Sequence, residues 1–229
     1  IIEAKRPYAC AYKPQFAHFA AEGRTGELKA VLDYLREAAP ECLAILDAKR
    51  GDIGSTAQQY AREAFAYYGA DAVTVNPYMG GDTLQPFTDY RDRGVFLLCK
   101  TSNPGSAELQ DLDLANGLPL YLQVAERASR SWNRHGNLAL VVGATYPEPL
   151  ARVREIVGDM PVLVPGIGAQ GGDLEATLRA GLRADGWGLL INSSRGILYA
   201  STGPDYAEAA ARAAEDLRDA CRRIQEAAS

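Results

Sequence analysis

The chain has 229 residues, of which 47% are hydrophobic and 23% charged, and its formal net charge is −5 at pH 7. This composition is typical of a globular protein with one sizeable hydrophobic core. The weakly acidic balance argues against a general nucleic-acid binder and against a basic membrane-surface protein. It leaves room for a local basic pocket that binds one small anion.

The sequence contains no apolar stretch of about 18 residues, so we expect no transmembrane helix. Its first residues do not have the pattern of a signal peptide, and we therefore expect a cytoplasmic protein. The four cysteines form no CxxC pair and are widely spaced: Cys10, Cys42, Cys99 and Cys221. Plain core or surface thiols in a reducing compartment are expected, with a disulfide or a metal site as the alternative.

Short apolar runs of strand character alternate along the chain with longer segments of helical periodicity. The strand-like runs are 8–13, 42–49, 72–77, 95–100, 138–144, 161–168 and 187–194. The helical segments are 26–39, 56–69, 121–136, 147–158 and 172–184, and a long amphipathic helix after Asp205 ends the chain. Continuous apolar strands separated by helices predict a parallel sheet buried on both faces.

Seven βα units without a linker or a break in composition predict a single α/β domain over residues 1–229. A closed (β/α)8 TIM barrel needs eight such units. The chain opens in what looks like the tail of a helix, so we infer that the first strand of the barrel is absent from the sequence shown. An open, doubly wound sheet of seven strands is the structural alternative.

In an α/β barrel, active-site side chains lie at the C-terminal ends of the strands. Lys13 ends one predicted strand, and the run DAKRGD ends the next with Asp47, Lys49 and Asp52. Asp47 and Lys49 are two residues apart and would face the same side of a strand. Buried charges need partners, and Lys13 supplies a second cation. An ordinary ion pair is the alternative, but two acids and two bases at the catalytic end favour a functional cluster.

A second candidate site is the glycine-rich segment PGIGAQGGD (165–173), together with Arg195. Its glycines leave backbone amides exposed before a helix expected to begin near Asp173, an arrangement that binds phosphate. Arg195 follows the last predicted strand and adds a charge-assisted fork. Two alternatives remain: a plain tight turn, and a GxGxxG dinucleotide site, which belongs at the first βα turn of a Rossmann half.

Several segments resemble the signatures of the orotidine 5′-phosphate decarboxylase family in order and spacing. They are DAKRGDIGST (47–56), SNPG (102–105), PGIGAQGGD (165–173) and the segment around Arg195; AYKPQ (11–15) and NPYMGGD (76–82) are similar to its longer bacterial branch. The resemblance implies a TIM barrel that converts orotidine 5′-phosphate to UMP and CO2, the last step of de novo pyrimidine biosynthesis. It also implies a cytoplasmic homodimer that uses neither metal nor cofactor, with no nucleic-acid or membrane partner.

The resemblance further implies a role for each matching residue. The catalytic set is an alternating tetrad, in which Lys49 protonates C6 of the pyrimidine and Asp52 reaches into the partner subunit's site: Lys13, Asp47, Lys49 and Asp52. The substrate-binding set comprises residues that contact the neighbouring site, the base or the phosphate: Ile53, Thr56, Ser102, Pro165, Gly168, Gln170, Gly171 and Arg195. The family's ribose-contacting aspartate, at the end of its first strand, has no counterpart in the sequence shown.

Two other functions stay open at this point. Mg2+-dependent relatives, a sugar-phosphate aldolase or 3-keto-gulonate 6-phosphate decarboxylase, share the D-x-K-x-x-D core but resemble one another in a metal-binding glutamate. This chain has Lys13 there, which would repel a cation. A non-catalytic phosphate-binding protein would have no use for a charged tetrad that is costly to bury.

Overall fold

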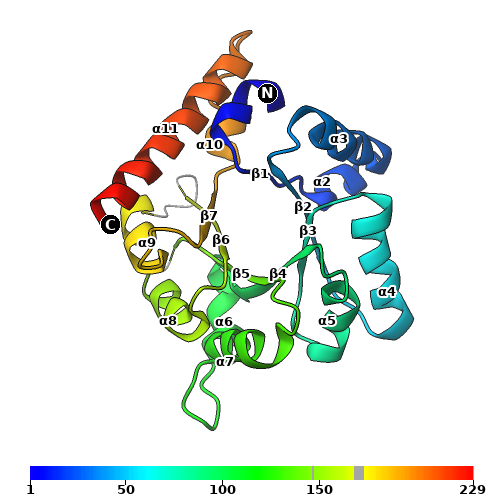
Figure 1. Cartoon of the computed structure of the whole chain (residues 1–229), viewed down its shortest axis with the longest axis vertical. Helices are drawn as coiled ribbons and strands as arrows, with labels where there is room; N and C mark the ends of the chain where they lie inside the picture. The colour runs from blue at the N-terminus through cyan, green and yellow to red at the C-terminus, as the bar shows by residue number, and fades with distance from the viewer. Residues whose placement is uncertain (146, 168–172, 229) are drawn as a thin grey trace. The chain divides into compact units, whose positions relative to one another are not determined.

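The computed structural model of the chain describes residues 1–145, 147–167 and 173–228 (Figure 1). The named strands pair in parallel in the described part of the chain. The strands are β1 (Ala11–Tyr12), β2 (Leu43–Arg50), β3 (Ala72–Val75), β4 (Gly94–Lys100), β5 (Leu138–Val142), β6 (Val162–Pro165) and β7 (Leu189–Asn192). Each overlaps a run predicted from the sequence, and the parallel pairing is confirmed.

Helices follow the strands, and the long ones coincide with the predicted helical segments. The α-helices are α1 (Ile2–Lys5), α2 (Phe16–Ala21), α3 (Thr25–Ala38), α4 (Gly54–Arg62), α5 (Gly81–Thr88), α6 (Ala107–Gln110), α7 (Leu120–Arg127), α8 (Pro147–Val157), α9 (Leu174–Gly181), α10 (Arg195–Leu198) and α11 (Tyr206–Ala228). Two π-helical turns, η2 (Glu63–Tyr67) and η4 (Ala128–Trp132), extend α4 and α7. Two short 3-10 turns are η1 (Arg6–Tyr8) and η3 (Pro104–Ser106). The sequence analysis missed α5, because Pro86 lies inside it.

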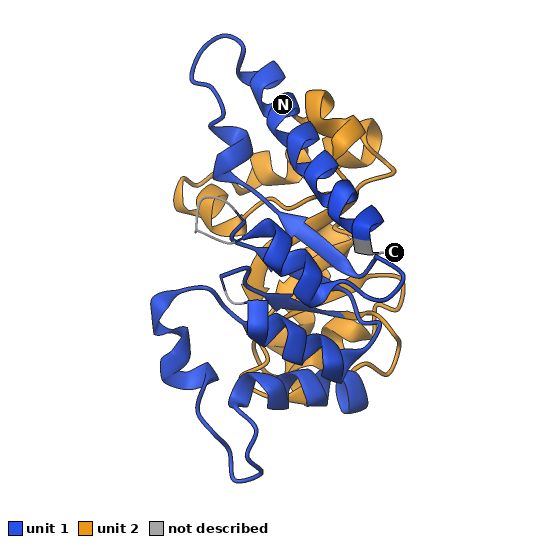
Figure 2. Cartoon of the chain, turned by 90° about the vertical axis from the view of Figure 1, so that its left-hand side faces the viewer, with its two compact units in different colours: residues 1, 98–132, 139–229 blue, residues 2–97, 133–138 orange. Residues whose placement is uncertain are grey.

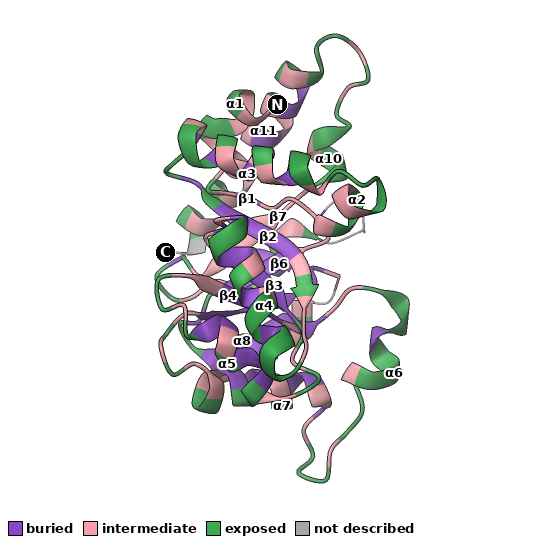
Figure 3. Ribbon diagram, turned by 90° about the vertical axis from the view of Figure 1, so that its right-hand side faces the viewer, coloured by how far each residue is buried: buried purple, intermediate pink, exposed green. Residues whose placement is uncertain are grey.

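The chain divides into two compact units, coloured separately in Figure 2. One of them, unit 2, comprises residues 2–97 and 133–138. Within it, β1, β2, β3 and the start of β4 pair in chain order. In Figure 3 the middle of β2 is buried, at residues 44–47, and α3 buries Leu28, Leu32 and Leu35 at helical spacing. The helical periodicity predicted for this segment therefore corresponds to a buried stripe in the structure.

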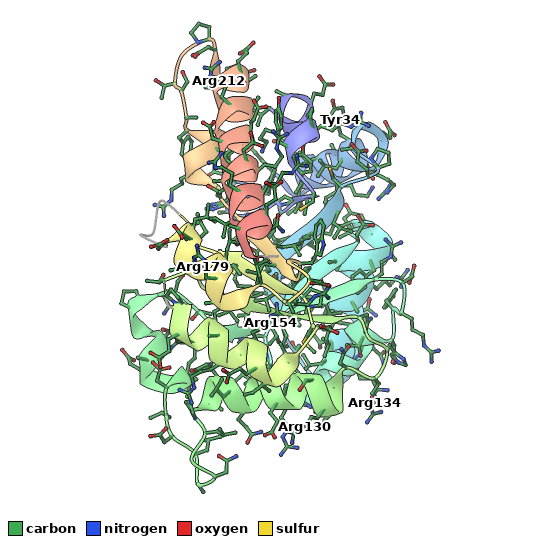
Figure 4. All side chains as sticks on the ribbon, turned by 60° about the vertical axis from the view of Figure 1, so that its left-hand side comes forward. Tyr34, Arg130, Arg134, Arg154, Arg179 and Arg212 are labelled. Atoms are coloured by element: carbon green, nitrogen blue, oxygen red, sulfur yellow. The ribbon has the colours of Figure 1, made fainter. Side chains whose placement is uncertain are left out.

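The other unit, unit 1, comprises residues 1, 98–132 and 139–229. Its strands β5, β6 and β7 pair in chain order, and every residue of β5 is buried. Arg154 on α8, labelled in Figure 4, donates hydrogen bonds to the carbonyls of Gly181, Gly158, Met160 and Gly188 at 2.8, 2.6, 2.7 and 2.9 Å. One side chain thereby ties together four carbonyls of this unit.

These observations confirm an α/β fold with parallel strands in chain order within each unit. The closed eight-stranded barrel, the absent first strand and the single domain remain predictions. Among the described residues, no helix is both long and apolar enough to cross a membrane. Cys42 and Cys99 are buried core thiols, as predicted, and burial raises the pKa of Cys99 to about 12.

Candidate active site

The first candidate site lies where β1 and β2 end, in unit 2. The two strands pair in parallel, and the segment after β1 stays beside β2, because Gln15 bridges to Asp47 and the Asp47 amide donates to the Pro14 carbonyl at 3.0 Å. This pairing brings Lys13 next to Asp47. The structure thus brings Lys13 and Asp47 together, as the sequence predicts for two neighbouring strand ends, and their role stays a prediction.

Asp47 is the centre of a charge cluster formed by Lys13, Asp47 and Lys49. Its side chain is only 6% exposed. One carboxylate oxygen accepts a hydrogen bond from Lys13 Nζ, and the other accepts from Lys49 Nζ at 2.6 Å and from the Thr74 hydroxyl at 2.9 Å. Burial raises the pKa of Asp47, but the Lys13 charge and the hydrogen bonds from both lysines outweigh it and hold this pKa below its ordinary value. The carboxylate therefore stays ionised at neutral pH.

The backbone that carries this cluster is not a regular strand. Leu46 pairs with Val73, but the next pairing joins Arg50 to Val75, so β2 bulges between them. Lys49 lies within the bulge at φ +46°, and it is the one non-glycine residue with positive φ in the described part of the chain. From their spacing of two, Asp47 and Lys49 were predicted to face the same side of a regular strand. Their side chains do meet, but in a bulge, where the regular alternation of a strand does not hold.

The end of the bulge is held by Arg50. Its guanidinium forms two hydrogen bonds with the Glu63 carboxylate, at 3.0 and 2.9 Å. It also lies 4.3 Å from the ring centre of Phe16 and 4.6 Å from that of Tyr60. The Arg50 carbonyl accepts from the Asn76 amide at 2.8 Å. The sequence analysis gave Arg50 no role, although Tyr60 and Glu63 stand on the predicted helix that follows it.

The other residues after the bulge are not joined to the cluster. The Asp52 carboxylate accepts from the Ile53 amide at 2.7 Å, and among the described residues no lysine pairs with it. Ile53 is 62% exposed, and Thr56 is exposed in the first turn of α4. The structure thus brings together three members of the predicted tetrad and leaves Asp52, Ile53 and Thr56 facing outward or half-buried.

In unit 1, the segment after β4 carries Ser102. A β-carbon built on Gly143 would lie 2.8 Å from the Ser102 β-carbon and 3.1 Å from its backbone nitrogen. Only glycine permits this approach without a shift of the backbone. The Gly143 amide also donates to the Lys100 carbonyl at 2.9 Å, so the chain after β5 supports Ser102 directly. The sequence analysis missed Gly143, whose only signal is a glycine directly after an apolar run.

Lys100 anchors the same segment from inside. Its side chain is only 3% exposed and its ammonium donates to the Asp111 carboxylate at 2.6 Å. One step along the chain, the Thr101 amide donates to the Gln110 side chain at 2.8 Å, and the Gln110 amide donates to the Thr101 hydroxyl at 2.8 Å. Two residue pairs, Lys100 with Asp111 and Thr101 with Gln110, therefore close the base of the loop that carries Ser102.

The predicted phosphate site is described in part. Gly168, Gln170 and Gly171 lie outside the described residues. Pro165 ends β6, and its carbonyl accepts from the Ala144 amide at 2.9 Å. After the gap, the helix begins as predicted: the Asp173 carboxylate caps α9 by accepting from the Ala176 amide at 3.1 Å.

Arg195 is the first residue of α10 and is exposed. No acidic side chain pairs with it among the residues that the structure describes. Its charge is therefore not neutralised by a carboxylate from that part of the chain, which suits a residue that binds an anion.

A family model, "Orotidine 5'-phosphate decarboxylase / HUMPS family", matches residues 1–213 of this chain. The chain belongs to this family. Its resemblance to the orotidine 5′-phosphate decarboxylase family, inferred above from short segments, is thereby confirmed over most of its length.

Individual relatives in this decarboxylase family agree. The chain is 58% identical over 221 residues to a Bordetella petrii protein named orotidine 5'-phosphate decarboxylase. This match covers 96% of this chain and 81% of the Bordetella petrii protein. It resembles the solved Leishmania donovani OMP decarboxylase with a TM-score of 0.85 and 48% identity, over 98% of this chain and 84% of that one. It also matches Leishmania donovani UMP synthase, with a TM-score of 0.90, 49% identity and 98% of this chain covered, but spans only 48% of that longer protein.

Proposed function

We propose that this chain decarboxylates orotidine 5′-phosphate to UMP and CO2, the last step of de novo pyrimidine nucleotide biosynthesis. Membership of the decarboxylase family and the names of its relatives support this reaction. The observation that carries the proposal is the charge cluster, in which a buried carboxylate holds two lysine ammonium groups at adjacent strand ends. The family resemblance assigns both lysines to the reaction.

In the proposed reaction, the bond between C6 and the carboxylate breaks and its electron pair stays on C6. Such a carbanion has no conjugated electron sink, so the enzyme must stabilise localised negative charge. The Lys49 ammonium does this electrostatically and then donates a proton to C6. Its side chain is 45% exposed, whereas that of Asp47 is 6% exposed, so the ammonium can meet a ligand while its anchor stays buried.

Repulsion between Asp47 and the substrate carboxylate would favour loss of CO2, but its size is limited. Two charges about 4 Å apart at an effective dielectric constant near 20 interact by about 4 kcal/mol. Enzymes commonly lower barriers by about 8–23 kcal/mol. Most of the rate enhancement must therefore come from preorganised cations and from binding energy of the remote phosphate.

The remaining roles follow the family resemblance. Ser102 binds the pyrimidine ring, Gln170 bridges base and phosphate, and Arg195 binds the phosphate with backbone amides of the segment 165–171. In a homodimer, Asp52, Ile53 and Thr56 reach the neighbouring site. The outward placement of Ile53 and Thr56 is compatible with that contact. We further propose that the chain forms one (β/α)8-barrel domain and acts in the cytoplasm.

A Mg2+-dependent sugar-phosphate reaction is the main competing function, since the matched family also includes the HUMPS group. The Lys13 ammonium, bound to Asp47, argues against a divalent cation at that position. The test is turnover of orotidine 5′-phosphate, followed by its absorbance, with and without EDTA, beside sugar phosphates with Mg2+. We expect EDTA-insensitive formation of UMP. Turnover of a sugar phosphate only, or tight UMP binding without any turnover, would contradict the proposal.

A further inference from the structure

Thr74 is a buried polar residue to which the proposed mechanism assigns no role. It stands in the middle of β3, where every residue is buried and its neighbours are Val73 and Val75, and it is 1% exposed. A hydroxyl in such surroundings is costly unless its hydrogen-bonding capacity is used. Its position is therefore informative about what it binds.

The Thr74 hydroxyl uses its full capacity within the bulge of β2. It donates to the Asp47 carboxylate at 2.9 Å and accepts from the backbone amides of Ala48 at 3.1 Å and Lys49 at 2.9 Å. A hydroxyl offers one donor and two acceptor positions, so these three bonds saturate it. All three partners belong to the segment that carries the charge cluster.

The two hydrogen bonds that the Thr74 hydroxyl accepts replace backbone hydrogen bonds that the bulged sheet does not form. Since the ladder passes from Leu46 directly to Arg50, the amides of Ala48 and Lys49 have no partner in β3 backbone pairing. Both bonds are only partly buried, and a backbone amide shielded from water is costly to leave without a hydrogen-bond partner. Lys49 also adopts φ +46°, a left-handed backbone conformation that is strained for a residue with a side chain. Such a conformation persists only where its surroundings hold it.

We propose that Thr74 is a positioning residue that aims Lys49 at the substrate, an inference that rests on the proposed decarboxylation. Thr74 binds the backbone of Lys49 at one end and the Asp47 carboxylate at the other, while Asp47 binds Lys49 Nζ at 2.6 Å. The Lys49 amide, the Thr74 hydroxyl, the Asp47 carboxylate and the Lys49 ammonium are thereby linked in one closed ring of hydrogen bonds. The ring fixes both where the Lys49 side chain starts and where its charged end lies.

The test compares variants of the full-length enzyme by kcat, KM for orotidine 5′-phosphate, affinity for UMP and thermal unfolding. Thr74→Val keeps the shape and removes the hydroxyl; Thr74→Ser keeps the hydroxyl. Thr88→Val is the matched control, because Thr88 is 5% exposed and its hydroxyl donates to the Gln85 carbonyl within helix α5, at 3.3 Å. If Thr74→Val does not fold, Thr74→Ala, which leaves space for a water molecule, takes its place.

We expect Thr74→Val to lower kcat by about 10- to 100-fold, as displacements of about 1 Å do. KM and UMP affinity should change by less than about threefold, and Thr74→Ser should recover most of kcat. A kcat within about threefold of the wild type for Thr74→Val, or an equal loss in Thr74→Ser or Thr88→Val, would overturn the role of Thr74 alone. A wild-type enzyme that does not convert orotidine 5′-phosphate would instead overturn the proposed function, and the role of Thr74 with it.

Discussion

The charge cluster of unit 2 and Arg195 of unit 1, which we propose to bind the phosphate, are built in opposite ways. In the cluster, the Asp47 carboxylate is buried and already accepts three hydrogen bonds from the protein. Arg195, in contrast, is exposed and has no carboxylate partner among the described residues. Groups proposed to stabilise the transition state are preorganised by one another, whereas the group proposed to bind the phosphate keeps its charge available.

Loss of the buried anion should have the largest effect. Asp47→Asn leaves two lysines without their shared counter-ion, so we expect kcat to fall by about 10³-fold or more, as for other preorganised electrostatic groups. UMP binding should change much less. Steady-state kinetics with UMP titration as a control measures both, and a kcat within tenfold of the wild type would contradict the role of the cluster.

Asp47→Asn should also change how the free energy of unfolding depends on pH in acid. The pKa of Asp47 is lowered in the folded state, so the unfolded state binds more protons in acid. The stabilisation is complete above the unfolded pKa, at about pH 4, and is lost as pH falls through the folded pKa. Unfolding midpoints of Asp47→Asn between pH 2 and 5 should therefore depend less on pH than those of the wild type.

Removal of the exposed cation should act on binding first. Without Arg195, a charge-assisted bond to phosphate is lost, which is worth about 1.5–3 kcal/mol. We expect Arg195→Ala to raise KM and weaken UMP binding by about 10- to 100-fold. Affinity for uridine, which has no phosphate, should be unchanged in the same titration. An equal loss for uridine would show that Arg195 does not act on the phosphate.

Substitution of Arg154, whose side chain binds backbone carbonyls of unit 1, should lower the free energy of unfolding and leave kcat unchanged. Arg154→Met removes the side-chain donor from four backbone carbonyls, of which that of Gly188 keeps the Val162 amide, and we expect a loss of about 2 kcal/mol in the free energy of unfolding. Arg130→Met is the control, because Arg130 is 75% exposed and pairs with Glu126 one helical turn away, at 2.7 Å. Urea unfolding of both variants tests this, and equal midpoints would contradict the account.

A substitution of Gly143, which supports Ser102, should have the smallest effect on activity. In Gly143→Ala, the new methyl group meets the backbone of Ser102 at 3.1–3.2 Å and displaces it slightly. We expect KM for orotidine 5′-phosphate to rise up to about tenfold, because a displaced Ser102 loses a hydrogen bond to the pyrimidine worth about 0.5–1.5 kcal/mol. The thermal midpoint should fall little. An unchanged KM would show that Ser102 tolerates the shift or does not bind the pyrimidine.

The elements that followed simple periodicity were predictable. Apolar runs marked all seven described strands, and β2 was placed to within one residue at each end. Helix α5 was not predictable in this way, because Pro86 and its glycines break the helical pattern. For the site, the charged run after one apolar stretch and Lys13 after the neighbouring one predicted three residues that the structure brings together, whereas Asp52, predicted as the fourth, is not joined to them.

What the sequence could not reveal is the support around that cluster. The bulge depends on a hydroxyl 25 residues beyond Lys49, and nothing in a run of apolar residues marks Thr74 as different from a core threonine. Gly143 likewise matters through its approach to Ser102, a contact between segments about forty residues apart. Such contacts depend on strand register, which periodicity alone does not determine.

The most direct test of the central claim is the rate of UMP formation by Lys49→Ala, beside the wild type, with UMP affinity as the control for folding and binding. We predict that turnover of orotidine 5′-phosphate falls by at least about 10³-fold, because both charge stabilisation and the proton donor are removed. UMP binding should persist. Near-normal turnover by Lys49→Ala would contradict the proposed mechanism and the role of the charge cluster.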